Sequence, residues 1–274
     1  MVHEWKCPRC GISAWSDSRG RLSEAAGSHL LEHHPGRISK ADFRLRWECP
    51  YCEASGKAHE ERTALEEFER HLCGHAMKTI DARAHMAASI GRSGNVLVEA
   101  PVESAAANNA RVHFLAGSDL AIVVTTRPKA RIGLLSDRLE RWPDRTVVVT
   151  TKRRPLDGGL DVDLSSAPLE LVELDRRLGP LDLGETISRI VDAHHTPETT
   201  VSVEFDILSD IVQSFELRRS YDFVRMLSKR LGEVGALTHF YVADRPELSS
   251  ALNVLEGTID LTLDVESQVF IADR

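Results

Sequence analysis

The feature that most constrains this chain is an internal repeat of 42 residues, in which each copy reads Cys-x2-Cys-x18-His-x3-His. Two His at positions i and i+4 project from one face of a helix, and a Cys pair separated by two residues fits a tight turn. Each copy can therefore bring four ligands to one metal ion. The predicted ligands are Cys7, Cys10, His29 and His33 in the first copy, and Cys49, Cys52, His71 and His75 in the second.

The residues around the second His pair predict a helix. Thr63 and Glu66 have the spacing of a capping box, and an apolar stripe of Leu65, Phe68 and Leu72 runs beside the His pair. In the first copy His34 is an alternative ligand to His33, because a His-x4-His spacing is also acceptable. Cys73 belongs to neither ligand set and is expected to be a free thiol.

These ligand types and spacings favour zinc, and we expect two structural Zn²⁺ ions. Four protein ligands leave no open position for water, so neither site should be catalytic. A module of about forty residues buries too little apolar surface to fold unaided, and bound metal would supply folding free energy. The alternative, in which these are ordinary thiols and surface histidines, leaves the matched spacing of eight residues unexplained.

The two copies resemble Cys2His2 zinc fingers over roughly residues 5–34 and 47–75, with two departures. The 18-residue gap between the second Cys and the first His exceeds the usual 12 to 15, and residues 60–70 hold five Glu against two Arg. An acidic helix would be repelled by DNA phosphates, so a protein partner is favoured over DNA. The basic residues between the copies are interpreted as a solvated linker, with a phosphate-contacting strip as the alternative; they are Arg37, Lys40, Arg44 and Arg46.

Composition sets the broad class. The chain has 274 residues and a net charge of -8, and residues 1–80 are neutral, with 12 basic and 12 acidic side chains. Strongly basic nucleic-acid surfaces are therefore not indicated. Neither a long apolar run nor a secretory signal pattern is present, so we expect a cytoplasmic protein without a membrane span.

Beyond a predicted helix over 76–90 and a polar Gly-rich segment at 91–94, the pattern changes to short β-branched strands that alternate with helices. This alternation predicts an α/β fold with a parallel sheet. We expect zinc units at 1–41 and 42–80, a helix and linker at 81–94, and a second domain at 95–274. The predicted strands are 96–100, 120–125, 146–151, 200–205 and 236–242, and the predicted helices are 105–115, 185–193 and 217–231.

The second domain is similar to RecA-like ATPases of the clock-protein type, in a combination that resembles regulatory proteins of halophilic archaea. The likeness covers roughly residues 94–266: Asn95 to Ala110 looks like the first strand, phosphate loop and helix, and Val203 to Asp206 like the acidic strand. A working loop reads Gly-x4-Gly-Lys-Ser/Thr. Here the matching positions are Ala100, Ala105, Ala106 and Ala107, and only Asp206 survives as a possible magnesium residue. The alternative for Asp206 is a carboxylate that caps the next turn.

Loss of the Lys and the hydroxyl removes the groups that stabilise a transferred phosphoryl group. We therefore expect a non-enzymatic, zinc-binding regulatory or adaptor protein whose ATPase-like domain no longer hydrolyses ATP. Two alternatives stay open. One is a DNA-binding transcriptional regulator that uses the zinc units, and the other is a nucleotide-binding ATPase with an unconventional loop.

Overall fold

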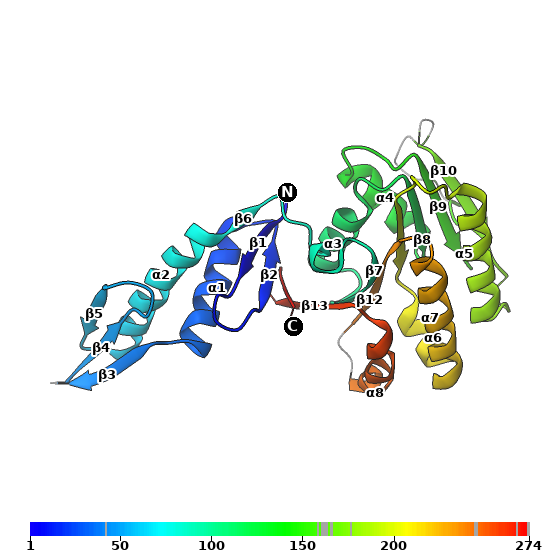
Figure 1. The fold of residues 1–274 in the computed structure, drawn as a ribbon. Helices are drawn as coiled ribbons and strands as arrows, with labels where there is room; N and C mark the ends of the chain where they lie inside the picture. Colours follow the sequence, from blue (N-terminus) through cyan, green and yellow to red (C-terminus); the bar gives the residue numbers. More distant parts are fainter. Residues whose placement is uncertain are drawn as a thin grey trace. The chain divides into compact units, whose positions relative to one another are not determined.

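The chain forms two compact units, which are residues Met1–Met86 with Val265–Arg274, and residues Ala87–Asp264 (Figure 1). The structure is a computed structural model, and it describes residues 1–41, 43–157, 159, 164, 167–175, 177–243, 246–266 and 268–272. Within the described residues, no helix is both long enough and apolar enough to cross a membrane.

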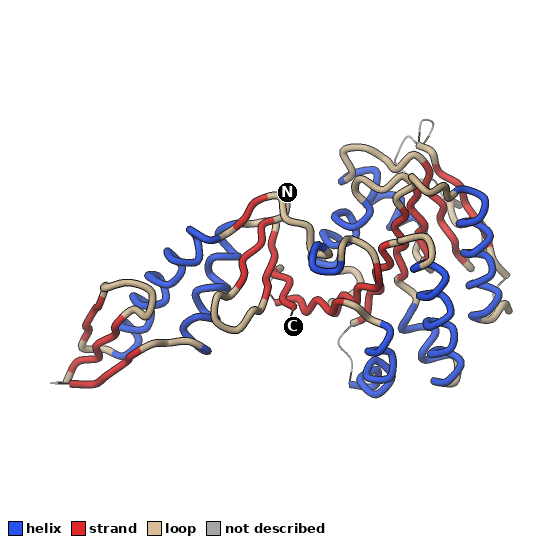
Figure 2. Tube along the Cα trace, viewed as in Figure 1, coloured by secondary structure: helices blue, strands red, loops and turns tan. Residues whose placement is uncertain are grey.

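The first unit contains two β-hairpin-and-helix modules (Figure 2). Its four-stranded sheet has the order β14-β2-β1-β6, and a separate three-stranded sheet has the order β3-β4-β5. The described strand pairs within both sheets are antiparallel. The elements are β1 (His3–Lys6), β2 (Ser13–Ser16), α1 (Arg19–His33), β3 (Arg37–Ala41), β4 (Arg44–Glu48), β5 (Ser55–Ala58), α2 (Glu61–Thr79), β6 (Asp81–Ala82) and β14 (Val269–Ala272).

One apolar core holds both modules of this unit together. Helix α2 contributes a buried stripe with a four-residue period, formed by Ala64, Phe68, Leu72 and Ala76. The Phe68 ring stacks on Trp47 of β4, with the ring centroids 4.8 Å apart. The buried apolar side chains of α1 belong to the same core cluster. The two repeat copies therefore share one core and do not form two separate domains.

The second unit is a parallel sheet covered by helices on both faces. Its strand order is β10-β9-β8-β11-β12-β7-β13, and each described neighbouring pair is parallel. The elements are β7 (Gly94–Glu99), α3 (Ala105–Leu115), β8 (Leu120–Val124), α4 (Pro128–Arg138), β9 (Arg145–Thr150), β10 (Leu169–Glu173), α5 (Pro180–His194), β11 (Val201–Phe205), α6 (Leu208–Ser214), α7 (Leu217–Gly232), β12 (Leu237–Val242), α8 (Pro246–Leu255) and β13 (Leu261–Glu266), with 3₁₀ turns η1 (Ala88–Ile90) and η2 (Glu256–Thr258).

Alternation along the central strands divides the apolar core of this unit into two layers. Ile122 and Val124 of β8 belong to the larger cluster, which also contains side chains of α5 and α7. Ala121 and Val123 belong to the smaller cluster, with Leu115 of α3 and side chains of α4. Successive strand residues point to opposite faces, and a strand buried on both faces needs an uninterrupted apolar run. The α/β fold with a largely parallel sheet agrees with the sequence prediction.

Several local predictions differ from the structure. The predicted helix over 76–90 is wrong after Thr79, where β6 and η1 follow. The predicted capping box at Thr63 is also wrong, because α2 starts at Glu61 after the N-cap Glu60. The segment interpreted as a linker forms the β3-β4 hairpin, so the expected boundary at 41/42 falls inside it. Residues 265–274 belong to the first unit rather than to the second domain.

Candidate metal centres and the edge of the parallel sheet

Each Cys pair lies on a tight turn that follows a strand. In the first turn the amide of Cys7 donates to the carbonyl of Ile12 at 2.8 Å, and the amide of Gly11 donates to the carbonyl of Cys7 at 3.1 Å. Gly11 has a φ of +83°, which a residue without a Cβ adopts readily. The second turn closes in the same way, because the amide of Cys49 donates to the carbonyl of Ala54 at 2.9 Å.

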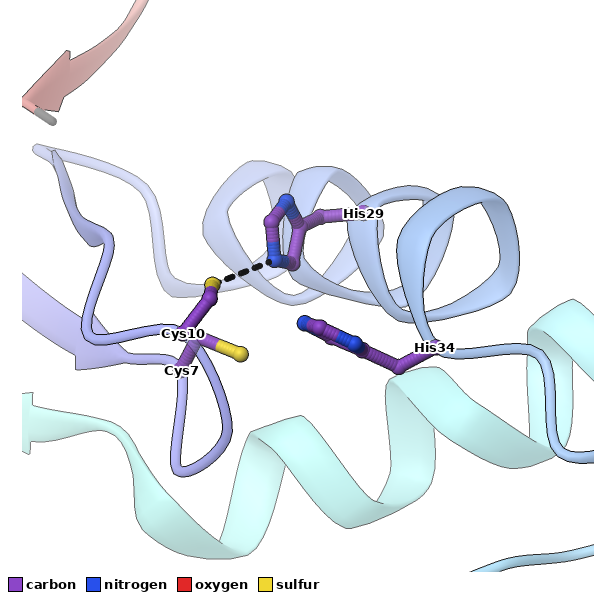
Figure 3. A group of neighbouring side chains, drawn as sticks. All are labelled: Cys7, Cys10, His29 and His34. Carbon is purple, nitrogen blue, oxygen red and sulfur yellow. Dashed lines mark hydrogen bonds between the residues drawn. The ribbon is translucent and has the colours of Figure 1, made fainter.

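The first cluster that could hold a metal ion contains Cys7, Cys10, His29 and His34 (Figure 3). One donor atom from each residue lies within 4.8 Å of the others. Nε2 of His29 is 3.4 Å from Sγ of Cys10. Both imidazoles come from the C-terminal end of α1, and both thiols come from the turn after β1.

His34, rather than the predicted His33, completes this cluster. Helix α1 ends at His33, and His34 is the C-cap residue with a non-helical backbone, φ -138° and ψ 46°. Two residues at positions i and i+4 share a face only within a continuous helix, so the spacing of His29 and His33 does not determine the ligand at the point where α1 ends. Pro35 gives the physical reason, since proline disfavours the α conformation in the residue before it. The His33 side chain instead is 56% exposed and lies 3.9 Å from Glu32.

The second cluster contains Cys49, Cys52, His71 and His75, the four residues predicted from the repeat. Nε2 of His71 is 3.3 Å from Sγ of Cys52, and Nε2 of His75 is 3.5 Å from Sγ of Cys49. The two imidazole Nε2 atoms are 3.2 Å apart. Helix α2 continues to Thr79, so the i, i+4 geometry holds at this His pair.

These separations fit a tetrahedral metal ion. With Zn–S near 2.3 Å and Zn–N near 2.0–2.1 Å, a tetrahedron places sulfur and nitrogen about 3.5 Å apart and two nitrogens about 3.3 Å apart. The S···N distances of 3.3 to 3.5 Å and the N···N distance of 3.2 Å in the second cluster match these edges. The two clusters can therefore each hold a metal ion.

The protonation of the second cluster suits metal binding. Burial lowers the pKa of His75, helped by the nearby His71, so its ring is neutral and can offer a lone pair. Burial raises the pKa of Cys49, and a cation that binds there must displace the thiol proton. The amides of Tyr51 and Ala54 point at Sγ of Cys49 and Cys52, each at 3.4 Å, and they would stabilise the thiolates.

In the second unit, the predicted phosphate loop and Asp206 lie at the carboxyl edge of the sheet. Ala100 follows β7, Ala105 begins α3, and the side chains of Ala106 and Ala107 are buried. The hydroxyl of Ser104 accepts a hydrogen bond from the amide of Ala107 at 3.1 Å, which caps the helix internally. One amide that a phosphate would use is thus already satisfied by the chain.

A buried ion network, which the sequence analysis did not identify, joins this loop to β11. Arg131 of α4 is 2.8 Å from Asp206 and 3.1 Å from Glu204, and it also contacts Glu103 of the loop at 2.9 Å. Arg111 of α3 contacts Glu204 at 2.7 Å. The guanidinium of Arg111 also lies 3.9 Å from the centre of the Tyr241 ring. The only sequence signal for these ion pairs was that an arginine lies on the helix after each of two buried strands: Arg111 on α3 after β7, and Arg131 on α4 after β8.

Within this network, the Asp206 carboxylate is bound by side chains of the same chain. The hydroxyl of Thr125 donates to the same carboxylate oxygen of Asp206, at 2.9 Å, that Arg131 contacts. The buried charges balance, because Arg111 and Arg131 face Glu204 and Asp206. The second oxygen of Asp206 is buried without a hydrogen-bond partner among the described residues. A divalent cation placed there would nevertheless be repelled by the Arg131 guanidinium beside it.

A cavity of about 230 Å³ lies beside this network, at the carboxyl ends of β8, β9 and β10. Its walls are mostly apolar, with threonine hydroxyls and the carboxylates of Asp175 and Asp210 among them. None of the described residues that line it is Lys or Arg. Among the described residues, the lining therefore offers a phosphate group no charge-assisted hydrogen bond from a Lys or Arg side chain.

The model of a family of unknown function, DUF7504, matches residues 93–265, which is more than half of the chain. The chain belongs to the DUF7504 family. The matched DUF7504 segment covers the parallel-sheet unit and excludes both Cys and His clusters. No curated protein matches the sequence. The solved structure of PH0250 from Pyrococcus horikoshii OT3 is similar, with 11% identity and a TM-score of 0.44 over 66% of this chain and 85% of that chain.

Proposed function

We propose that this DUF7504 protein is a non-enzymatic regulatory or adaptor protein. Its first unit would hold two structural zinc ions, and its second unit would be a RecA-like domain that has lost its phosphate chemistry. The observation that carries the proposal is the pairing of Asp206 with Arg131, because an aspartate bound to an internal arginine is a poor magnesium ligand.

The loop supports the same proposal through its charge. Glu103 forms ion pairs with Arg127 and Arg131, so these two guanidinium groups are already neutralised by a carboxylate of the chain. An incoming triphosphate would have to displace Glu103 and would find no lysine in the loop. Ala106 stands where that lysine is expected, and a methyl group cannot stabilise charge on a transferred phosphoryl group.

The zinc assignment rests on the donor set and its geometry. Thiolates and imidazoles in a tetrahedron are the ligands that structural zinc takes, and four of them leave no position open for a reacting water. The metal would then contribute folding free energy to the first unit and leave its surface free for a partner. The acidic residues of α2, of which Glu61, Glu66 and Glu67 are exposed, favour a protein over DNA as the partner of that helix.

The experiment compares magnesium-dependent ATP turnover in the wild-type protein and in Asp206→Ala. We expect both to stay at the rate of a protein-free control, and ATP with magnesium to leave the melting temperature unchanged. Turnover by the wild type that disappears in Asp206→Ala would overturn the proposal. Asp210→Ala, a neighbouring carboxylate on α6, is the matched control for a general effect of charge at this edge.

A further inference from the structure

The three-stranded sheet β3-β4-β5 has two chemically different faces. The register places Trp47 opposite Gly56 and Ile38, and this face packs on α2 through the stacked pair of Trp47 and Phe68. Because successive side chains alternate, the neighbouring residues point to the opposite face. The side chains of that face are Arg37, Ser39, Arg44, Arg46, Glu48, Ser55 and Lys57.

This second face, which we name the cationic face, is exposed and positively charged. Arg37, Arg44, Arg46 and Lys57 are all exposed. Glu48 is the one acidic residue in the three strands, and it lies between Arg37 and Arg46, at 4.0 and 3.5 Å. Among the described residues of this face, four cations and one carboxylate leave a net charge of +3, on a chain whose net charge is -8.

Repulsion between the cations of the cationic face lowers the stability of the sheet. Arg46 and Lys57 are direct cross-strand partners, and like charges in that position destabilise a strand pair. Arg44 donates to an imidazole nitrogen of His59 at 3.1 Å, which leaves its charge unneutralised. An anion bound across the strands would relieve the repulsion between these side chains.

A large aromatic side chain lies at the end of strands β3 and β4. Phe43 is at the tip of the β3-β4 hairpin, and 92% of its surface is exposed. Its φ of +60° lies in the left-handed region, which costs energy for a residue with a Cβ. Neither burial nor backbone preference explains a phenylalanine here, and an exposed ring is suited to stack on a planar partner.

We propose that the cationic face and Phe43 form a binding surface for single-stranded nucleic acid. The cations would contact successive phosphates, and the Phe43 ring would stack on a base, which is the combination that single-strand binding requires. The acidic residues of α2 do not oppose this, since the helix packs on the other face of the sheet. A protein segment made only of Asp and Glu would match the cations but would give the exposed ring no aromatic partner. This surface is independent of the proposed adaptor function.

The test measures the affinity of zinc-loaded full-length protein for a fluorescent thymidine 20-mer between about 50 and 300 mM salt. The triple variant Arg44→Ala, Arg46→Ala, Lys57→Ala should bind more than about tenfold more weakly at low salt. Its salt slope should fall by about 2, since each phosphate that is no longer neutralised lowers the slope by about 0.7. Phe43→Ala should weaken binding about tenfold at an unchanged slope, because it removes stacking and no charge.

The matched control is Arg218→Ala, Arg219→Ala, Arg225→Ala, which removes three exposed charges from α7 of the other unit. It should keep most of the affinity and the slope. Zinc content and circular dichroism verify that every variant folds. The proposal is overturned if the wild type does not bind the oligonucleotide, if both triple variants behave alike, or if poly-glutamate competes as well as the oligonucleotide does.

Discussion

At the scale of single residues, the last turn of α1 decides which imidazole faces the first thiol pair. His33 is the last helical residue and is exposed, whereas His34 leaves the helix and joins Cys7, Cys10 and His29. We expect His34→Ala to reduce bound zinc from two ions to one per chain. His33→Ala should retain two ions, because its ring lies outside the cluster of Cys7, Cys10, His29 and His34. Metal content after dialysis measures both, and loss of metal from His33→Ala with full retention in His34→Ala would contradict the assignment.

The buried His239 of β12 should make the stability of the second unit depend on pH. It is fully buried between the hydroxyls of Ser202, at 3.2 Å, and Tyr241, at 2.8 Å. Burial, reinforced by Arg111, holds the pKa of His239 well below its usual 6.5. Below about pH 6.5, His239 is therefore protonated in the unfolded chain but stays neutral in the folded chain. The free energy of unfolding falls as the pH drops below that value.

This group alone should cost up to about 1.4 kcal/mol of unfolding free energy for each pH unit below about 6.5. The variant His239→Gln should be less stable at neutral pH by about 1–3 kcal/mol, because a buried hydrogen bond is removed. Its stability should nevertheless fall less steeply between about pH 6.5 and 5. Urea unfolding at each pH measures both slopes, and parallel slopes in wild type and variant would show that His239 does not titrate on unfolding.

At the scale of elements, helices α1 and α2 approach each other closely at Gly27. A Cβ built on Gly27 would lie 2.3 Å from Sγ of Cys73 and 3.1 Å from its backbone nitrogen. We expect Gly27→Ala to force the helices apart and to lower stability by about 1–3 kcal/mol. Adding Cys73→Ala removes the sulfur and should restore part of this stability. Gly74→Ala, at a position where an added Cβ meets nothing within 4 Å, is the control. Denaturant unfolding of zinc-loaded protein measures each variant.

The same elements show what the sequence could predict. The 42-residue repeat predicted the whole second cluster, because its two His lie within a continuous helix and spacing then determines direction. The first cluster needed one further signal, the effect of Pro35 on His34, which periodicity does not contain. Five strands of the second unit were predictable because each is a short, mostly apolar run, whereas β10 and β13, which carry acidic side chains, were not predicted. The pairing of Arg131 with Asp206 was not, since it joins residues 75 positions apart whose meeting depends on the tertiary fold.

At the scale of the whole molecule, the chain builds the first unit, passes through the second, and returns with β14. The returning strand pairs with β2, and Phe270 lies opposite Trp15 in that register. Val269 belongs to the apolar core that surrounds α1 and α2. The stability of the first unit should therefore depend on both ends of the chain and on bound metal, whereas that of the second unit should depend on its own larger core.

A strong zinc chelator should therefore unfold the first unit and leave the second folded. Trp5, Trp15 and Trp47 lie in the first unit and Trp142 in the second, so most of the tryptophan emission should shift to the red while the helical circular dichroism falls only in part. Deleting residues 268–274 should lower the chelator concentration needed, since β2 would have no β14 to pair with. Ala110→Asp, a substitution in the buried face of α3, should instead destabilise the second unit and leave the zinc content unchanged. Unfolding of both units together on chelation would show that the second unit cannot fold without the first.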